Sequence, residues 1–401
     1  MGYSKVVGAI EIGTSKVAIL IGEISNDGSL NIIGHYTGLA KGVKKGVIVD
    51  LEAASASVHA SILRAENEAN VKISEVYLAQ TGMHLKGIFN VGTANVSSSD
   101  GLISKSDIER AKEDAKRPRL PEGRVFINHI QNPFSIDGVK TENPLHKKGR
   151  RLKVGYWAIH ADSKILQDSL RVIRGVPLDV EDVILSSIAS SNVLLHENEK
   201  KAGALVVDIG GGTTDFALYR DGFIVYTGVI PVGGDHISND LSMGLRTSVE
   251  VADKLKLREG LALEVKKDPK AYVWLVGNQI IGDREIPLIS VSKIVESRLK
   301  EIFEIIVEEL TELKLFNKKE IASGVVLTGG TSKIIGIEHL VARVMDLECR
   351  LGSCHWDISE DLNVPEYTTA LGLLSYAVAN NEGSQSKGGS IINFLRGFLD
   401  R

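Results

Sequence analysis

Hydrophobic residues recur in two copies of one pattern: an apolar run that ends in an acid, then glycine and hydroxyl residues, then a second apolar run. The first copy spans residues 5–24 and has its acid at Glu11; the second spans 204–218, with Asp208 before three glycines. In both copies a short turn then leads into a third apolar run, at Asn26-Asp27-Gly28 and at Arg220-Asp221-Gly222. We interpret the pair as an internal duplication of a strand–turn–strand–turn–strand unit.

The spacing of apolar residues elsewhere predicts an alternation of helices and strands. Apolar residues three and four positions apart are typical of helices, whereas short β-branched runs are typical of strands. We expect helices over 50–69, 163–174, 180–195, 236–243, 248–256, 293–315 and 367–379. We expect strands over 74–80 and from 325, where two glycines precede a helix start.

The pattern changes between about residues 84 and 160. An alternating strand over 87–96 is followed by a helix that we expect to begin at a capping box formed by Ser106 and Glu109. Two further strands are expected at 125–130 and 153–160, joined by a polar loop. These elements predict a small inserted α+β subdomain. The basic run at 147–151 fits a solvated loop better than an anion site.

The glycine-rich turns suggest phosphate binding. Glycine has no Cβ to obstruct a ligand, and the backbone N–H groups that converge in such a turn form a concave anion site. An acid at the strand end, Glu11 or Asp208, would supply oxygen to a phosphate-bound Mg²⁺ or its waters. One such turn could simply be a tight hairpin. A second copy, and a strand–Gly-Gly–helix start at 325–333 against which a flat base could lie, favour the nucleotide interpretation.

Composition limits the remaining classes of function. The 401 residues suffice for two or more domains. With 47 Lys and Arg against 51 Asp and Glu, the net charge is −4, so the chain has no overall positive charge for binding nucleic acid. Two cysteines without zinc-finger spacing fit a reduced cytosolic setting. We expect no membrane span and no signal peptide.

The C-terminal residues form a separate pattern. Residues 381–389 are rich in Gly, Ser and Asn and read as a flexible linker. Residues 390–401 place apolar side chains on one helical face, which fits reversible binding to a membrane surface, the alternative being a terminal helix that docks on its own domain. The apolar residues are Ile391, Ile392, Phe394, Leu395, Phe398 and Leu399.

The duplicated turns and the Gly-Gly strand end resemble the actin/hexokinase/chaperone ATPase superfamily, and within it most closely the FtsA family of bacterial division proteins. The resemblance covers almost the whole chain, including 188–191, 367–372 and the amphipathic tail. It implies an α/β, actin-like fold of two lobes with duplicated ribonuclease-H-like domains. The implied boundaries are 1–83, 163–192 and 361–380 for the first lobe, 84–162 for the inserted subdomain, 193–228 and 303–360 for the second lobe, and 229–302 for subdomain 2B.

The resemblance also implies which residues bind ATP and Mg²⁺. Glu11 and Asp208 would face the metal, and Asp253 stands where the family's ribose-side motif has Glu, one methylene longer. No catalytic residue is implied, so we expect at most a slow ATPase. The further implied contacts are Gly13, Thr14, Ser15 and Lys16 in the first turn, Gly210, Gly211, Gly212 and Thr213 in the second, and Gly233, Gly234, Lys256, Gly329, Gly330 and Thr331 beside them.

The resemblance finally implies a role and partners. The protein would polymerise at the division site on the cytoplasmic face of the inner membrane. It would bind the C-terminal peptide of FtsZ, and so anchor the FtsZ ring, and it would recruit later division proteins. Lys293 and Arg298 are the expected peptide contacts. Two alternatives remain: a PilM-like scaffold of a type IV pilus, which would lack a free amphipathic tail, and a small-molecule kinase, for which no acceptor-site aspartate is identified.

Overall fold

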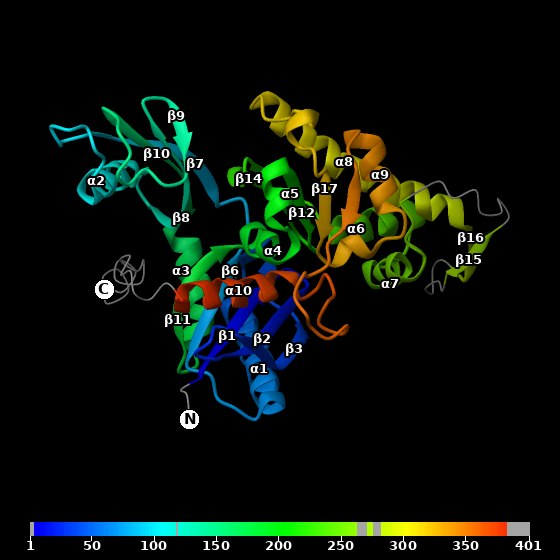
Figure 1. Ribbon diagram of the computed structural model, residues 1–401. Helices are drawn as coiled ribbons and strands as arrows, with labels where there is room; N and C mark the ends of the chain where they lie inside the picture. Colours follow the sequence, from blue (N-terminus) through cyan, green and yellow to red (C-terminus); the bar gives the residue numbers. More distant parts are fainter. Residues whose placement is uncertain (1–3, 118, 263–270, 276–281, 383–401) are drawn as a thin grey trace.

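Two five-stranded sheets of identical layout form the body of the protein (Figure 1). The computed structural model describes residues 4–117, 119–262, 271–275 and 282–382. In spatial order, the first sheet consists of β3 (Leu30–Leu39), β2 (Lys16–Ile24), β1 (Lys5–Ile12), β6 (Glu75–Gln80) and β11 (Asp179–Leu185). The second consists of β14 (Phe223–Ile230), β13 (Thr214–Arg220), β12 (Ala204–Ile209), β17 (Val325–Thr328) and β18 (Cys349–Leu351).

The duplication predicted from the sequence is confirmed by the strand pairing. β1 pairs antiparallel with β2 and parallel with β6, and β12 pairs in the same way with β13 and β17. In both copies a backbone bond closes the turn after the acid-bearing strand, from Gly13 N–H to Lys16 C=O (2.8 Å) and from Gly210 N–H to Thr213 C=O (2.9 Å). The turn in each half of the molecule is therefore closed by the same backbone hydrogen bond, from residue i to residue i+3.

Helices cover the first sheet and join it to the second. Helix α10 packs on α4 and against β1, β2 and β6. A Cβ at Gly372 would lie 1.8 Å from the carbonyl oxygen of Ala189, so only glycine permits this approach of α10 to α4. The helices and the small hairpin on this side are α1 (Leu51–Ala69), α3 (Ser163–Arg174), α4 (Ser186–Leu194), α10 (Thr368–Glu382), β4 (Val43–Lys44) and β5 (Val47–Ile48).

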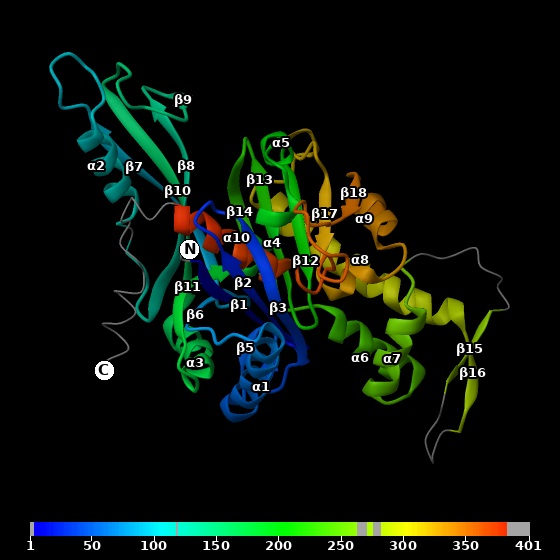
Figure 2. The same ribbon diagram turned by 60° about the horizontal axis from the view of Figure 1, so that its bottom comes forward.

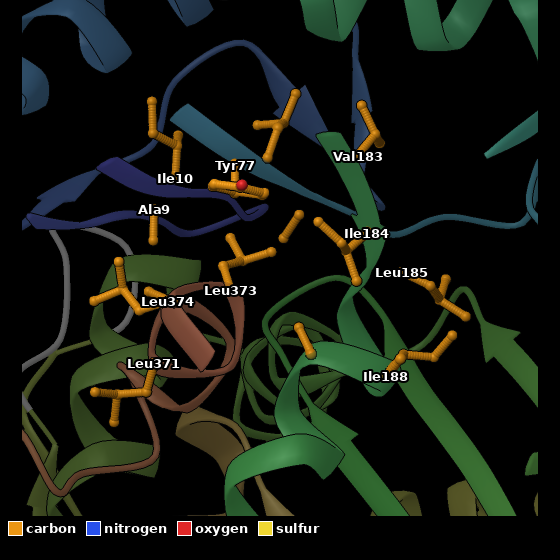
Figure 3. Close-up of a cluster of buried hydrophobic side chains, with 14 of the residues drawn as sticks. Ala9, Ile10, Tyr77, Val183, Ile184, Leu185, Ile188, Leu371, Leu373 and Leu374 are labelled. Atoms are coloured by element: carbon orange, nitrogen blue, oxygen red, sulfur yellow. The ribbon is translucent and has the colours of Figure 1, made fainter. Parts of the chain in front are cut away.

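The main hydrophobic core lies between the first sheet and these helices. Figure 3 shows Ala9 of β1 and Ile184 of β11 on the face of the sheet next to Leu373 of α10. Ile10 and Val183, their neighbours along the strands, point to the other face. Nearly all of these side chains are completely buried, so the two central helices hold the acid-bearing strand β1 in place. The labelled members are Ala9, Ile10, Tyr77, Val183, Ile184, Leu185, Ile188, Leu371, Leu373 and Leu374.

The second sheet carries its own core and a projecting helical region (Figure 2). Helices α6 and α8 pack together, and α8 also contacts α7 and α9. The elements here are α5 (Glu197–Ala202), α6 (Gly234–Leu245), α7 (Val249–Glu259), β15 (Tyr272–Leu275), β16 (Arg284–Pro287), α8 (Leu288–Glu312), η1 (Lys318–Glu320), η2 (Gly330–Lys333) and α9 (Ile337–Met345).

The inserted α+β unit stands to one side of the body (Figure 1). Its sheet has the order β7-β10-β8-β9, and α2 covers one face. Its elements are β7 (Lys86–Asn95), α2 (Lys105–Ala115), β8 (Arg124–Ile136), β9 (Val139–Thr141) and β10 (Arg151–Asp162).

The structure corrects three sequence-based predictions. The segment expected to be helical over 180–195 begins as strand β11 and becomes helix α4 only at Ser186, because β11 pairs in parallel with β6. The capping box of α2 is formed by Ser104 and Asp107, not by Ser106 and Glu109. Helix α10 continues to Glu382, so the first two residues of the expected linker are helical.

Among the described residues, no helix is both long and apolar enough to cross a membrane. The apolar tail residues 391–399 lie outside the described part of the chain, as does most of the expected linker.

Candidate functional site

The two glycine turns face each other across a cavity of about 770 Å³. A Cβ at Gly211 would lie 2.3 Å from Ser15 Oγ, and one at Gly212 would lie 2.4 Å from Thr14 Oγ1. The two turns, which come from opposite halves of the chain, approach this closely because Gly211 and Gly212 have no side chains. The predicted residues that line the cavity are Glu11, Gly13, Thr14, Ser15, Lys16, Asp208, Gly210, Gly211, Gly212, Thr213, Gly234, Asp253, Lys256, Gly330 and Thr331.

Two predicted glycines do not line the cavity but pack behind its turns. A Cβ at Gly233 would lie 2.5 Å from the carbonyl oxygen of Gly210. Gly329 has a φ of +82°, and its Cβ would lie 2.4 Å from Asp208 Oδ1. Gly233 therefore requires glycine for close packing, and Gly329 requires it for both close packing and backbone conformation, rather than for direct ligand contact.

The two acids at the strand ends differ in their surroundings. Glu11 forms an ion pair with Lys16 (Oε2–Nζ 2.7 Å). Asp208 Oδ2 instead accepts hydrogen bonds from the hydroxyls of Ser190 (2.9 Å) and Thr369 (3.2 Å). Burial, with the nearby charge of Glu11, raises the pKa of Asp208 to about 6. Because Glu11 and Asp208 share the cavity, a divalent cation there would relieve the repulsion between them.

The sequence did not identify Asp215 as part of the site. Asp215 lies opposite Asp208 in the β12–β13 register and also lines the cavity. Burial raises its pKa to about 8, and its Oδ1 has no hydrogen-bond partner among the described residues. Its position one residue after the paired threonines was visible in the sequence, but its burial in the cavity was not.

A connected polar cluster lies on the side of the cavity formed by α6 and α7. Lys256 Nζ donates to the Ser238 hydroxyl (2.9 Å) and to the Gly234 carbonyl (3.2 Å), and it pairs with Asp253 Oδ1 (2.7 Å). Burial opposes ionisation of Asp253, but the hydrogen bonds from Lys256 and Ser238 outweigh it and lower its pKa. Asp253 is therefore an anion already held by Lys256.

Three exposed apolar side chains, Val249, Leu257 and Ile335, also line the cavity. Leu257 is 75% exposed and Ile335 is 70% exposed, so together they give this wall of the cavity an apolar surface. Thr331, on the same side, donates to the Gly210 carbonyl (3.0 Å) and so ties this wall to the second glycine turn. The sequence pattern missed Leu257 and Ile335 because single apolar residues carry no signal of their own.

The expected peptide contacts lie on α8. Arg298 forms a two-pronged ion pair with Asp240 (2.6 and 2.9 Å) and a further pair with Glu301 (2.5 Å). The Arg298 side chain is only 24% exposed. The pair with Asp240 raises the pKa of the guanidinium further, so Arg298 is a fixed cation. Lys293 lies five residues, or about 1.4 turns, earlier on the same helix.

The described residues contain no group of three or more His, Cys, Asp or Glu side chains arranged to hold a metal ion. Any metal in the cavity would thus depend on Glu11, Asp208 and oxygens from other sources.

Comparison with known proteins gives two family matches. Residues 205–372 match the family described as cell division protein FtsA, and residues 82–160 match the SHS2 domain inserted in FtsA. The second match coincides with the inserted unit that carries α2 and its four-stranded sheet.

Solved structures of related fold include a PilM–PilN type IV pilus biogenesis complex, with a TM-score of 0.65 and 16% identity over 93% of this chain and 98% of that one. MreB5 of Spiroplasma citri bound to ADP has a TM-score of 0.55 and 15% identity, over 94% and 98% of the two chains. At such low identity these structures support the actin-like fold alone.

Curated relatives are more similar in sequence. The cell division protein FtsA of Pseudomonas aeruginosa is 31% identical over 388 residues, covering 95% of this chain and 91% of that protein. FtsA of Neisseria meningitidis is 32% identical, covering 94% and 91%. FtsA of Escherichia coli K12 is 33% identical, covering 93% and 90%. With such identity across almost its whole length, this chain belongs to the FtsA family of cell division proteins.

Proposed function

We propose that this protein binds ATP with Mg²⁺ in the cavity between its two glycine turns and polymerises as an actin-like filament. We further propose that the filament anchors the FtsZ ring to the cytoplasmic face of the inner membrane and recruits later division proteins. The single observation that carries the nucleotide part is the approach of Gly211 and Gly212 to Ser15 and Thr14, with two acids alongside. The curated relatives favour this role over that of a pilus scaffold or a small-molecule kinase.

The phosphate groups fit between the two turns. Backbone N–H groups of the turns would bind phosphate oxygens, and Lys16 would compensate phosphate charge. Glu11 and Asp208 are the residues that would hold Mg²⁺, directly or through waters, since both are oxygen donors within one cavity. The metal would supply charge neutralisation between the phosphates and these carboxylates.

The adenosine would lie on the opposite side, near Gly330 and Thr331. A Cβ at Gly330 would meet no protein atom within 4 Å, so a flat base can approach this backbone. Leu257 and Ile335 offer the apolar surface that a base needs. Asp253 and Lys256 would face the ribose, although Asp253 is already paired with Lys256.

Titration calorimetry of the full chain tests this cavity. We expect saturable binding of ATP in the presence of Mg²⁺, in the micromolar range, and weaker binding when Mg²⁺ is chelated. A measurement with no binding heat and no thermal stabilisation by ATP would overturn the nucleotide proposal.

The FtsZ C-terminal peptide would bind beside α8, with Arg298 and Lys293 as cationic contacts. Co-sedimentation with this peptide is the direct test, but Arg298→Glu alone would also place an acid beside Asp240 and Glu301. A charge swap, Arg298→Glu with Asp240→Arg, restores the local pair while still removing the cation from position 298. Binding lost in both variants supports the contact, whereas binding restored by the swap would assign the loss to local destabilisation.

The membrane part of the proposal rests on the apolar face of the tail. Flotation with vesicles should recover the full chain but not a truncation after Asn381. Equal flotation of the two would remove the membrane anchor from the proposal.

A further inference from the structure

A second cavity, of about 1110 Å³, lies between the inserted unit and the edge of the second sheet. We call it the insert groove. One wall carries Phe89 and Val91 of β7, and the other carries Phe223 and Val225 of β14. Among the described residues, the insert groove and the nucleotide cavity have no lining residue in common.

The face of the inserted sheet that lines the groove is only partly covered: Trp157 and Asn132 are buried against β14, whereas Phe89 and Val91 are not. Helix α2 packs on the opposite face, where a Cβ at Gly92 would lie only 2.0 Å from the carbonyl oxygen of Ala111. Side chains alternate along a strand, so Phe89 and Val91 point away from α2 and into the groove. They are 53% and 51% exposed, which leaves an apolar surface without a partner in the described part of the chain.

Both walls also end in a sheet edge. β7 is the outer strand of the inserted sheet, and β14 is the outer strand of the second sheet. The Thr93 N–H points out of the β7 edge, where it donates to Asp114 (2.9 Å). Backbone groups face the same side at every second residue, so those of Phe89 and Val91 also face outward. An extended chain could therefore pair with β7 beside the groove.

The charges around the groove are mainly positive. Its two acids are already paired, Asp221 with Lys140 (2.7 Å) and Glu320 with Arg220 (2.8 Å). Three further lysines line it and form no ion pair with the described residues: Lys153, Lys201 and Lys319. The groove thus has an excess of cations beside an apolar surface, which complements an acidic ligand.

Two hydrogen-bonding atoms of the lining residues are unsatisfied. Asn132 Oδ1 and Arg220 Nε are buried without a partner among the described residues. Such groups are uncommon in folded proteins. The other side of Asn132 is fixed, because its Nδ2 donates to the Ile224 carbonyl (3.2 Å), and Trp157 Nε1 donates to the Thr227 hydroxyl (3.0 Å) nearby. These two bonds tie the inserted unit to β14 and preform the groove.

We propose that the insert groove binds an extended, acidic and apolar segment of a partner protein. The segment pairs its backbone with β7, packs alternate apolar side chains on Phe89 and Val91, and directs its carboxylates to Lys153 and the lysines opposite. This surface goes beyond the nucleotide, FtsZ-peptide and membrane sites, and it does not depend on any of them.

Fluorescence anisotropy of the full chain can test the groove with two labelled synthetic peptides. One alternates valine and glutamate over about eight residues, and the other has lysine in place of glutamate. We expect saturable binding of the glutamate peptide alone, weakened by salt. Phe89→Asp and Lys153→Glu should each weaken binding about tenfold or more. Val139→Asp is the matched control, because Val139 is 72% exposed on the same unit but does not line the groove.

Lys153→Glu keeps the test decisive even if Phe89→Asp perturbs folding. The proposal is overturned if the glutamate peptide does not bind, if the lysine peptide binds equally well, or if Lys153→Glu leaves binding unchanged. Self-association that is lost in Phe89→Asp, without peptide binding by the parent chain, would assign the groove to a contact between copies and also overturn it.

Discussion

The Thr81 hydroxyl donates a 2.6 Å hydrogen bond to Oδ2 of Asp215, across the floor of the nucleotide cavity. Its oxygen also lies 3.2 Å from the hydroxyl of Thr213 in the second glycine turn. Thr81 directly follows β6, and the chain enters β7 of the inserted unit at Lys86. The contact therefore links both halves of the cavity at the point where the inserted unit begins.

Replacing Thr81 tests the strength of this link. Thr81→Val keeps the shape of the side chain but removes the hydroxyl that donates to buried Asp215. We expect the free energy of unfolding to fall by about 1–3 kcal/mol, measured by urea denaturation. Thr81→Ser keeps the hydroxyl and should lose much less. Equal losses in the two variants would show that the hydroxyl contributes little.

Gly330 separates a binding role from a folding role. Because a Cβ there would meet no protein atom within 4 Å, Gly330→Ala should fold with unchanged thermal stability. If adenosine lies against this backbone, the added methyl should weaken ATP binding about tenfold or more, measured by calorimetry. Gly282→Ala is the control, since it too has open space but lies outside the cavity. Unchanged ATP affinity in Gly330→Ala would place the base elsewhere.

Gly211 should behave differently. A Cβ there would lie 2.3 Å from Ser15 Oγ and 3.1 Å from Asp235 Oδ1, so in Gly211→Ala the Ser15 hydroxyl must rotate away or the two turns must separate. We expect both lower stability, by about 1–3 kcal/mol, and loss of ATP binding. Differential scanning fluorimetry with and without ATP reports both effects. A variant of parental stability that still responds to ATP would contradict the close approach of the turns.

The sequence predicted the parts of the site that are local and repeated. Glu11 and Asp208 stood out because each ends an apolar run before glycine, and the second copy excluded chance. Thr81 and Leu257 were missed because their roles arise from contacts between distant segments. Strand β11 was interpreted as helix because Val180–Leu185 runs into a helix rich in Ser and Ala, whereas its pairing with β6 is a property of the folded sheet alone.

The residues that cap α2 could not be identified from the sequence alone. Ser106 and Glu109 fit the usual spacing, yet Ser104 and Asp107 fit it equally well, with Asp in place of Glu. Asp107 is completely buried and accepts hydrogen bonds from the backbone and hydroxyl of both Ser97 and Ser104. Only the packing of α2 against β7 decides between the two registers.

Asp107→Asn should destabilise the protein at neutral pH. Burial alone would raise the pKa of Asp107, but the bonds from Ser104 and Ser97 outweigh it and hold the pKa well below its usual range. This stabilisation is present above the unfolded pKa near 3.8 and is lost as the pH falls toward the folded value. We expect a loss of about 1–3 kcal/mol at pH 7 in chemical denaturation, with the gap to the parent narrowing below pH 3.8.

Glu109→Gln is the matched control for this cap, because Glu109 is 64% exposed and, among the described residues, forms an ion pair only with Lys112 (3.5 Å). It should change stability very little. A larger loss of stability in Glu109→Gln than in Asp107→Asn would instead support the capping box of Ser106 and Glu109 that the sequence predicts.

His84 should make stability depend on pH between about 6.5 and 4. Burial lowers the pKa of His84, the Asp162 charge opposes this shift, the Arg124 charge adds to it, and the resulting pKa is about 4. The unfolded chain therefore binds a proton in this range that the folded chain excludes, so stability falls as the pH falls from 6.5 toward 4. One pKa unit corresponds to about 1.4 kcal/mol, which gives a loss of stability of roughly 3 kcal/mol over the full range.

His84→Gln should reduce the slope of stability against pH in denaturation curves recorded at several pH values. His146→Gln, at an exposed position, should leave the slope unchanged. The same result for His84→Gln would assign the pH dependence to other groups, such as half-buried His129.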